Sequence, residues 1–135
     1  GVLLEVNCET DFVARTEGFQ EFCKNVAMHI AAASPMTILR EELSEKVIET
    51  EKNIFRDQSK KSGKPDEIIE KMIDGRMNKF YQENVLMEQS FVKNPDLSIN
   101  DLLTETIAKL GENISIARFS RYQLGETAPP TKSTD

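Results

Sequence analysis

The segment Asn7-Cys8-Glu9-Thr10-Asp11-Phe12-Val13-Ala14-Arg15 lies between two stretches with different hydrophobic periods. The run before it, Val2-Leu3-Leu4-Glu5-Val6, is short and rich in branched residues, as is typical of a strand. The run after it, Glu17 to Ala33, repeats its apolar residues at intervals of three and four, which predicts an amphipathic helix. We therefore expect this segment, called the corner segment below, to turn the chain from a strand into a helix.

The corner segment has two interpretations. An acidic residue followed directly by Phe, at a place where the chain turns, suits insertion of Asp11 and Phe12 into another molecule. Alternatively, the Asp11 carboxylate caps the next helical turn, while Phe12 and Val13 fold under the sheet. The second interpretation needs no partner, and apolar residues seldom require a functional explanation.

Length and charge limit the classes of function. With 135 residues the chain is long enough for one domain with a hydrophobic core. Its formal net charge of −6 disfavours a protein that binds nucleic acid by neutralising phosphates, so we expect a protein partner and no direct nucleic-acid contact. No apolar stretch approaches the length of a membrane span, so we expect no membrane contact. The chain begins at Gly1 inside an apparent strand, as a fragment or a processed product would.

The residues that could carry chemistry form no catalytic or metal-binding pattern. Cys8 and Cys23 lack a close metal-ligand spacing, and His29 is the single histidine. His29 lies at the edge of an apolar helix stripe, which favours a hydrogen-bonded structural residue over a catalytic base. We predict no catalytic residue, no metal and no cofactor, and two free thiols that serve in packing. A hydrolase or a metalloenzyme is the least favoured class.

Two further helices are expected in the middle of the chain. The first follows Ser44, a good N-cap, and its inner face is predicted to contain Leu43, Val47, Thr50, Ile54 and Gln58. The next opens at Pro65 and has a broad apolar stripe that includes Ile68, Ile69, Met72, Ile73, Met77, Phe80 and Tyr81. Such a stripe is either a buried core or a surface for self-association or a partner. The candidates for that surface are Met72, Met77, Phe80 and Tyr81.

The last third of the chain is predicted to contain one more helix. Residues 84–95 have little periodicity and are expected to cross the surface in extended form. Residues 96–111 have a helical period, with Ser98 and Asp101 at capping-box spacing and Gly111 as the stop.

The chain is predicted to return to the sheet at its end. Residues 113–124 alternate as a strand, with a bulge near Ala117 or Arg118 that turns Phe119 to the face opposite Ile116. The apolar first strand is expected inside the sheet. Residues 1–125 are therefore predicted to be one α+β domain, with a small antiparallel sheet from strands near both termini and about four helices between them. Residues 126–135 lack an apolar anchor and are expected to be a disordered tail.

The chain resembles the elongation factor Ts family. The resemblance is carried first by residues 6–15, which contain Thr10-Asp11-Phe12-Val13. It continues through Gly18-Phe19-Gln20, Met28-His29-Ile30-Ala31-Ala32, Lys71-Met72-Ile73-Asp74-Gly75-Arg76-Met77, Lys79-Phe80, Leu86-Met87-Glu88-Gln89, Gly111-Glu112-Asn113-Ile114 and Gly125-Glu126. These ordered matches cover nearly the whole chain.

The resemblance implies a guanine-nucleotide exchange factor without bond chemistry of its own. Its implied partner is elongation factor Tu, in GDP-bound and nucleotide-free form, and its implied partner-binding residues are Thr10, Asp11, Phe12 and Val13. It also implies the family's short form, a homodimer whose N-terminal helical module is absent from this chain. The implied location is the bacterial cytoplasm, with a plastid or the mitochondrial matrix as alternatives.

Two other functions fit the residues. A ribosome-associated or scaffold relative would keep the fold and the dimer but lack exchange, although the intact Thr10-Asp11-Phe12-Val13 disfavours it. Without the resemblance, the residues alone favour a plain helical dimerisation module. That hypothesis does not explain an outward-pointing Phe12.

Overall fold

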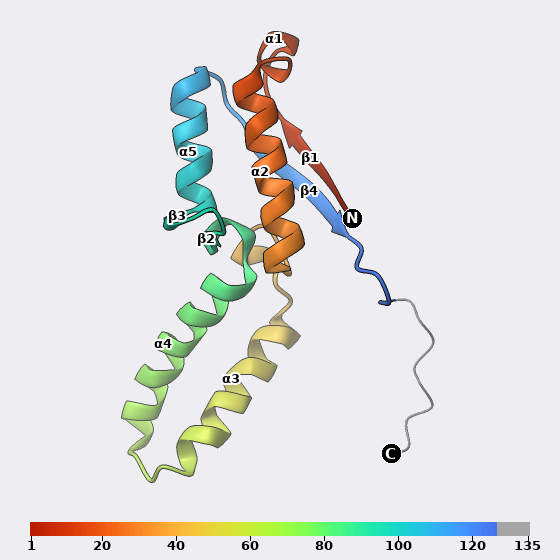
Figure 1. Cartoon of the computed structure of the whole chain (residues 1–135). Helices are drawn as coiled ribbons and strands as arrows, with labels where there is room; N and C mark the ends of the chain where they lie inside the picture. Colours follow the sequence, from red (N-terminus) through yellow and green to blue (C-terminus); the bar gives the residue numbers. More distant parts are fainter. Residues whose placement is uncertain (127–135) are drawn as a thin grey trace.

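The computed structural model of the protein describes residues 1–126, which form a body built on a two-stranded sheet and a helical hairpin that projects from it (Figure 1). The elements, in chain order, are β1 (Val2–Asn7), α1 (Asp11–Ala14), α2 (Glu17–Ala33), the 3-10 turn η1 (Arg40–Glu42), α3 (Glu45–Lys60), α4 (Asp66–Asn84), the 3-10 turn η2 (Leu86–Glu88), β2 (Ser90–Phe91), β3 (Asn94–Ser98), α5 (Ile99–Leu110) and β4 (Ser115–Arg121). The predicted α+β class is confirmed. Of the predicted tail, residues 127–135 lie outside the described residues.

The sheet pairs the two ends of the chain. β1 and β4 are antiparallel, from Val2 opposite Arg121 to Asn7 opposite Ser115. Within residues 1–126 this sheet has two strands, so the expectation that β1 lies inside a sheet is not met there. The side chains of Val2, Leu4 and Val6 pack on the core, whereas Leu3 on the other face is 75% exposed.

The predicted bulge in β4 is present, but its effect on Phe119 was predicted wrongly. Glu5 pairs with Arg118 and Val6 pairs with Ile116, which leaves Ala117 as the extra residue. An extra residue reverses the alternation that follows it. Phe119 therefore lies on the same side of the sheet as Ile116, and both pack on the core.

Helix α2 begins and ends where the sequence predicts because both ends are capped. At its start the Thr16 hydroxyl accepts a hydrogen bond from the Phe19 N–H at 3.2 Å. At its end Ser34 adopts a left-handed conformation, with φ 51°, and its N–H donates to the Ile30 carbonyl. Pro35 cannot supply an N–H to continue the helix.

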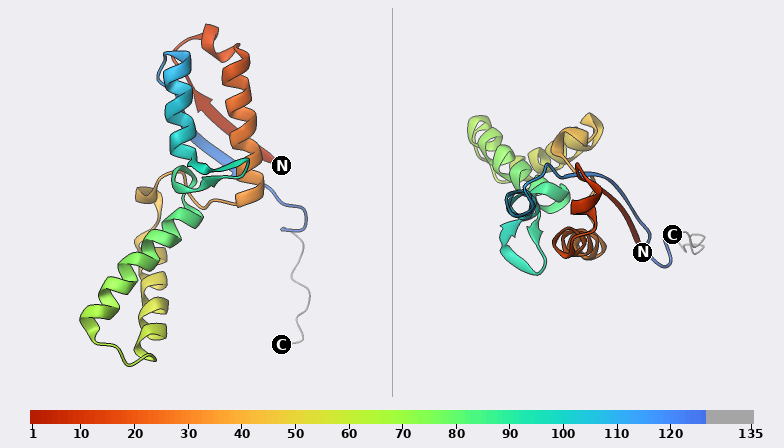
Figure 2. Two further views of the ribbon diagram at one scale, coloured as in Figure 1. Left: turned by 60° about the vertical axis from the view of Figure 1, so that its left-hand side comes forward. Right: turned by 90° about the horizontal axis from the view of Figure 1, so that it is seen from above.

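The main core lies between the sheet and the helices α2 and α5, which cover the same face of the sheet (Figure 2). Gly18 allows the close approach of these helices, because a Cβ at this position would lie 3.3 Å from Leu110 Cδ2. The buried residues of this core are Val13, Phe19, Phe22, Val26, Ile30, Ile38, Leu86, Phe91, Ile99, Ile114 and Ile116.

The α3–α4 hairpin has a separate apolar cluster. Its buried centre is Ile69, Ile73 and Met77 of α4, against which Ile48, Phe55, Phe80 and Tyr81 pack. The inner face predicted for α3 was therefore wrong: Ile54 is 43% exposed, and Ile48 and Phe55, each one residue further along, point inward. The prediction took its phase from Leu43, which precedes the helix and is buried on its own account.

The segment after α4 is more regular than predicted. Residues 84–95 contain η2 and β2, and β2 pairs with β3 in a second two-stranded sheet. Helix α5 starts at Ile99, three positions after the predicted start, because residues 96–98 belong to β3. The predicted capping box is confirmed: the Ser98 hydroxyl accepts from the Asp101 N–H, and the Asp101 carboxylate accepts from the Ser98 N–H, both at 3.0 Å.

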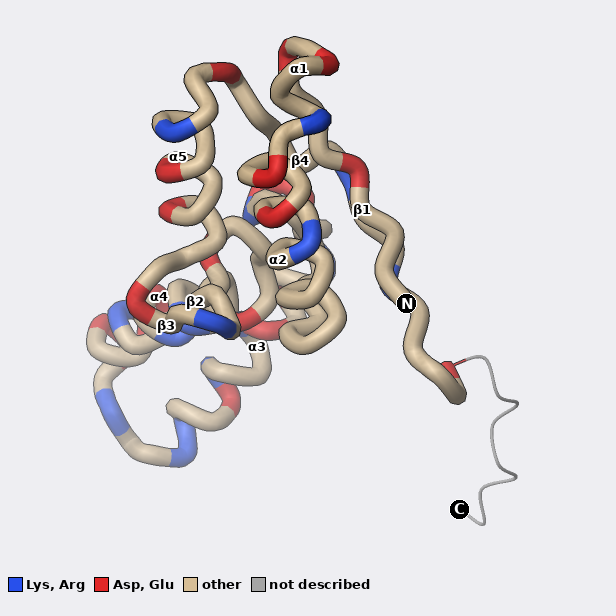
Figure 3. The backbone as a smooth tube through the Cα atoms, turned by 45° about the horizontal axis from the view of Figure 1, so that its top comes forward, with Lys and Arg blue, Asp and Glu red and all other residues tan. Residues whose placement is uncertain are grey.

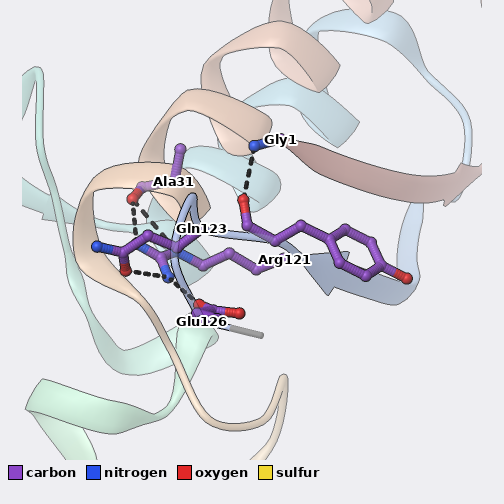
Figure 4. A network of polar contacts seen from close by, with 6 residues as sticks. Gly1, Ala31, Arg121, Gln123 and Glu126 are labelled. Carbon is purple, nitrogen blue, oxygen red and sulfur yellow. Dashed lines mark hydrogen bonds and ion pairs between the residues drawn. The ribbon is translucent and has the colours of Figure 1, made fainter. Parts of the chain in front are cut away.

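Arg121 joins the end of β4 to the end of α2 (Figure 4). Its guanidinium donates two hydrogen bonds to the Ala31 carbonyl, at 2.9 and 3.3 Å, and others to the side chains of Gln123 and Glu126. In a continued helix the Ala31 carbonyl would accept from the residue four positions later, and that residue is Pro35, which has no N–H. Arg121 therefore satisfies a carbonyl that the helix itself cannot.

Candidate partner-binding corner

The corner segment lies at the end of the body, between β1 and α2 (Figure 1). Within it, α1 presents one side chain to solvent and the next to the core. Phe12 is 86% exposed, and Asp11 is exposed beside it. Val13 is 8% exposed and belongs to the main core. Each interpretation of the sequence therefore describes part of the corner: Phe12 points outward, and Val13 packs inward.

Thr10, and not Asp11, caps α1. The Thr10 side chain accepts a hydrogen bond from the Val13 N–H at 3.3 Å, which corrects the alternative in which Asp11 made this cap. The chain then turns directly into α2, because the Thr16 hydroxyl donates to the Val13 carbonyl at 2.7 Å while it caps the second helix. The exposed side chains of Asp11 and Phe12 thus stand on a short turn that is hydrogen-bonded at both ends.

Glu112, in the loop between α5 and β4, bonds to the start of the corner. Its Oε1 accepts from the N–H groups of Glu9 and Thr10, each at 3.1 Å, and its Oε2 accepts from the Thr10 hydroxyl at 2.5 Å. In return, the Glu9 carboxylate accepts from the Asn113 N–H at 3.1 Å. Figure 3 shows acidic residues both at α1 and in the loop after α5. Sequence reasoning missed this contact, because no local pattern relates residues 103 positions apart.

The other candidate residues lie in the hairpin. Met77 is 3% exposed, and Phe80 and Tyr81 are half-buried against the same cluster. Met72 is half-buried too, with the Lys64 ammonium 3.8 Å from its sulfur. The Arg40 guanidinium covers the Tyr81 ring, 4.2 Å from its centroid. Packing against α3 therefore accounts for much of the stripe's width, and the structure brings none of these four residues to the corner segment.

His29 and the two cysteines lie within the body. The His29 Nδ1 accepts from the Val92 N–H at 3.2 Å, so its Nε2 carries the proton and donates to Gln89 Oε1 at 2.9 Å. Burial lowers the pKa of His29. Cys8 and Cys23 are free thiols. Burial raises the pKa of Cys23, and electrostatic repulsion from Cys8 raises it further. His29 is thus a hydrogen-bonded residue of the core, more deeply buried than its place at the stripe's edge suggested.

Among residues 1–126, no three His, Cys, Asp or Glu side chains gather as a possible metal site. None of the helices formed there has both the length and the apolar character to cross a bilayer.

The fold and the corner define the class as a small α+β domain with an exposed aromatic side chain on a braced strand-to-helix turn. Residues 20–126 match the profile of the family described as "Elongation factor TS". The chain belongs to the elongation factor Ts family. The profile match starts after the corner segment.

Proteins named elongation factor Ts in several bacteria are similar to the chain. That of Geotalea daltonii is 61% identical over 126 residues, which cover 93% of this chain and 58% of the relative. Those of Geobacter sulfurreducens and Carboxydothermus hydrogenoformans are 57% and 55% identical with the same coverage. The chain thus spans 58% of the length of these relatives.

Proposed function

We propose that the chain is a guanine-nucleotide exchange factor that binds elongation factor Tu, disturbs its magnesium site and promotes the release of GDP during translation elongation. Membership of the elongation factor Ts family supports the class of function. The observation that carries the proposal is the 86% exposure of Phe12 on a turn fixed by Thr10 and Thr16. A large apolar side chain that a hydrogen-bonded turn holds exposed to solvent suits insertion into another protein.

The proposed mechanism uses the corner as a wedge. Asp11 and Phe12, flanked by Thr10 and Val13, enter between helices of the partner's nucleotide-binding domain close to its magnesium ion. Mg²⁺ requires near-ideal octahedral geometry, so a small displacement of its ligands weakens its binding and then that of the GDP phosphates. The chain itself makes and breaks no covalent bond, and it needs no cofactor.

Thermodynamic linkage makes the effect of the exchange factor on the nucleotide reciprocal. The exchange factor and the nucleotide must weaken each other's binding by the same factor, which is why a nucleotide can later expel the factor. To convert a mostly closed nucleotide site into a mostly open one requires a coupling of about 5.5 kcal/mol, or about four decades in affinity. The factor therefore binds both the GDP-bound and the nucleotide-free partner, the latter more tightly.

The location and the assembly complete the proposal. The relatives come from bacteria, which supports action in the bacterial cytoplasm. The chain acts as a homodimer through the hairpin, where Ile54 and Ile68 are exposed apolar residues on the two helices.

The direct test is the release of a fluorescent GDP from elongation factor Tu, followed with and without this protein. We expect release to accelerate in proportion to the protein added, and the acceleration to be lost with Phe12→Ala. Binding without faster release would identify a scaffold that does not exchange nucleotide. An absence of both binding and acceleration would contradict the proposal as a whole.

A further inference from the structure

The contact between Glu112 and the corner fixes the direction of a chain of hydrogen bonds. A carboxylate accepts hydrogen bonds and donates none, so the Thr10 hydroxyl proton must point to Glu112 Oε2, 2.5 Å away. This leaves the oxygen of that hydroxyl free to accept the Val13 N–H at 3.3 Å. Donation to a charged group polarises the hydroxyl and makes it a better acceptor. Glu112 therefore strengthens the cap of α1 without touching the helix.

The same carboxylate holds the backbone just before α1. Its Oε1 accepts from two consecutive N–H groups, those of Glu9 and Thr10. The exchange is reciprocal, because the Glu9 carboxylate accepts from the Asn113 N–H on the other side. The ladder between β1 and β4 ends at Asn7 and Ser115. The side chains of Glu9 and Glu112 therefore continue the pairing of the two segments beyond the end of the sheet.

The position of Glu112 follows from the end of α5. Gly111 takes the left-handed conformation there, with φ 73°, and its N–H donates to the Ile107 carbonyl at 2.8 Å. L side chains rarely adopt this conformation, so glycine suits a helix that stops and turns at this residue. The next residue, Glu112, is thereby brought beside the corner segment, where the residue as a whole is half-buried.

The corner needs such a contact because α1 is too short to be stable alone. It has four residues, and an isolated helix of that length does not persist in water. Val13 is its buried anchor, and Phe12, at 86% exposure, gains little from packing on its own chain. The direction of the Phe12 side chain therefore depends on the backbone that carries it.

We propose that Glu112 is a positioning residue for nucleotide exchange, which fixes residues 9 and 10 and, through the Thr10 cap, the direction of Phe12. The proposal rests on the proposed exchange function. Glu112 acts through α1 and does not contact the nucleotide site itself. By holding the corner in one conformation before binding, it reduces the entropy that the corner loses when it binds.

The test is a double-mutant cycle on GDP release from elongation factor Tu. Glu112→Ala should slow release by about tenfold, the effect of losing a charged acceptor that is partly open to solvent. In a Phe12→Ala background the same change should add less than about twofold, because a residue that acts through Phe12 has nothing left to position. Glu105→Ala is the matched control: it removes an exposed carboxylate from α5 and should leave release unchanged.

Structural readouts separate positioning from general destabilisation. Glu112→Ala should increase amide hydrogen exchange at Glu9 and Thr10 in the free protein, while the amides of α2 keep their protection. If Glu112→Ala does not fold, Glu112→Gln replaces it, since its amide oxygen still accepts from both N–H groups, and it should show a smaller loss with the same non-additivity.

Two results would overturn the inference. One is a rate of GDP release with Glu112→Ala equal to that with Glu105→Ala. The other is a double variant whose loss of rate equals the loss from Glu112→Ala multiplied by the loss from Phe12→Ala. If the unaltered protein fails to accelerate release, the proposed function fails instead. The amide measurement then still decides whether Glu112 holds the corner.

Discussion

Phe12 and Val13 are neighbours in sequence, but α1 turns the first to solvent and the second to the core, with 86% of Phe12 and 8% of Val13 exposed. Val13 shares the main core with Phe19, whereas Phe12 lies outside that core. The contribution of Phe12 to binding can therefore be measured separately from the stability of the fold.

Phe12→Ala should keep the melting temperature of the unaltered protein and slow GDP release from elongation factor Tu by an order of magnitude or more. Phe19→Ala is the matched control, because the same side chain at 7% exposure should cost about 3 to 5 kcal/mol of unfolding free energy. Thermal melts and release rates of both variants provide the comparison. The opposite pattern, with Phe12→Ala unstable and still active, would place Phe12 in a structural role.

The stability of the protein should fall as His29 becomes protonated. The pKa of His29 in the folded state is lowered from 6.5, mainly by burial, so the unfolded chain binds the proton more readily. The contribution of neutral His29 to stability is fully present at pH values above the pKa of His29 in the unfolded chain. It decreases as the pH falls toward the lower pKa of His29 in the folded protein. Protonation would also place a second N–H against the Val92 N–H.

Urea midpoints at about pH 7.5, 6.5 and 5.5 would measure this dependence on pH. The chain has one histidine, so no other imidazole contributes. His29→Gln has no titrating group at this position and should give a flatter profile over the same range. Equal slopes for the two proteins would contradict the assignment.

Arg121→Ala should lower the unfolding free energy by about 1 to 2 kcal/mol, because it leaves the Ala31 carbonyl at the end of α2 without its donor. Arg118→Ala is the control from the same strand. Its side chain is 82% exposed and pairs with Glu5 in water, so its loss should have little measurable effect. Denaturant unfolding of the two variants checks the difference, and equal stabilities would show that the network in Figure 4 contributes little.

The homodimer predicts a mass in light scattering of twice 15.3 kDa at low micromolar concentration. Ile68→Glu, at a residue that is 46% exposed on α4, should shift the protein toward monomer if the hairpin forms the interface. Phe12→Ala, at the other end of the molecule, should leave the mass unchanged. A clean monomer for the unaltered protein would contradict the dimer.

Local patterns predicted the elements well where capping residues mark their ends. Ser44 and the Ser98–Asp101 pair each lie at the start of a helix in the structure, as predicted. The start of α5 was nevertheless predicted too early, since the polar residues before Ser98 suit a helix start as well as a short strand. The hairpin of β2 and β3 was missed because its strands are too short to show a period.

The corner was predicted only in part, for a physical reason. Periodicity located the turn between β1 and α2, but nothing in the segment states which of two adjacent apolar residues is buried. That choice is made by Thr10, whose bonds to Val13 and Glu112 set the orientation of α1. One of those partners is distant in sequence, and a single sequence does not reveal such pairs.

The pairing of β1 with β4 has a consequence for the order in which the molecule is made. During synthesis the helices α2, α3 and α4 leave the ribosome while β1 still lacks the strand opposite it, because Val2 pairs with Arg121 and Thr10 with Glu112. Contacts this distant along the chain form late and make folding slow. The corner segment is synthesised before these helices but is completed after them, so Phe12 acquires its final orientation only once Glu112 and β4 have been made.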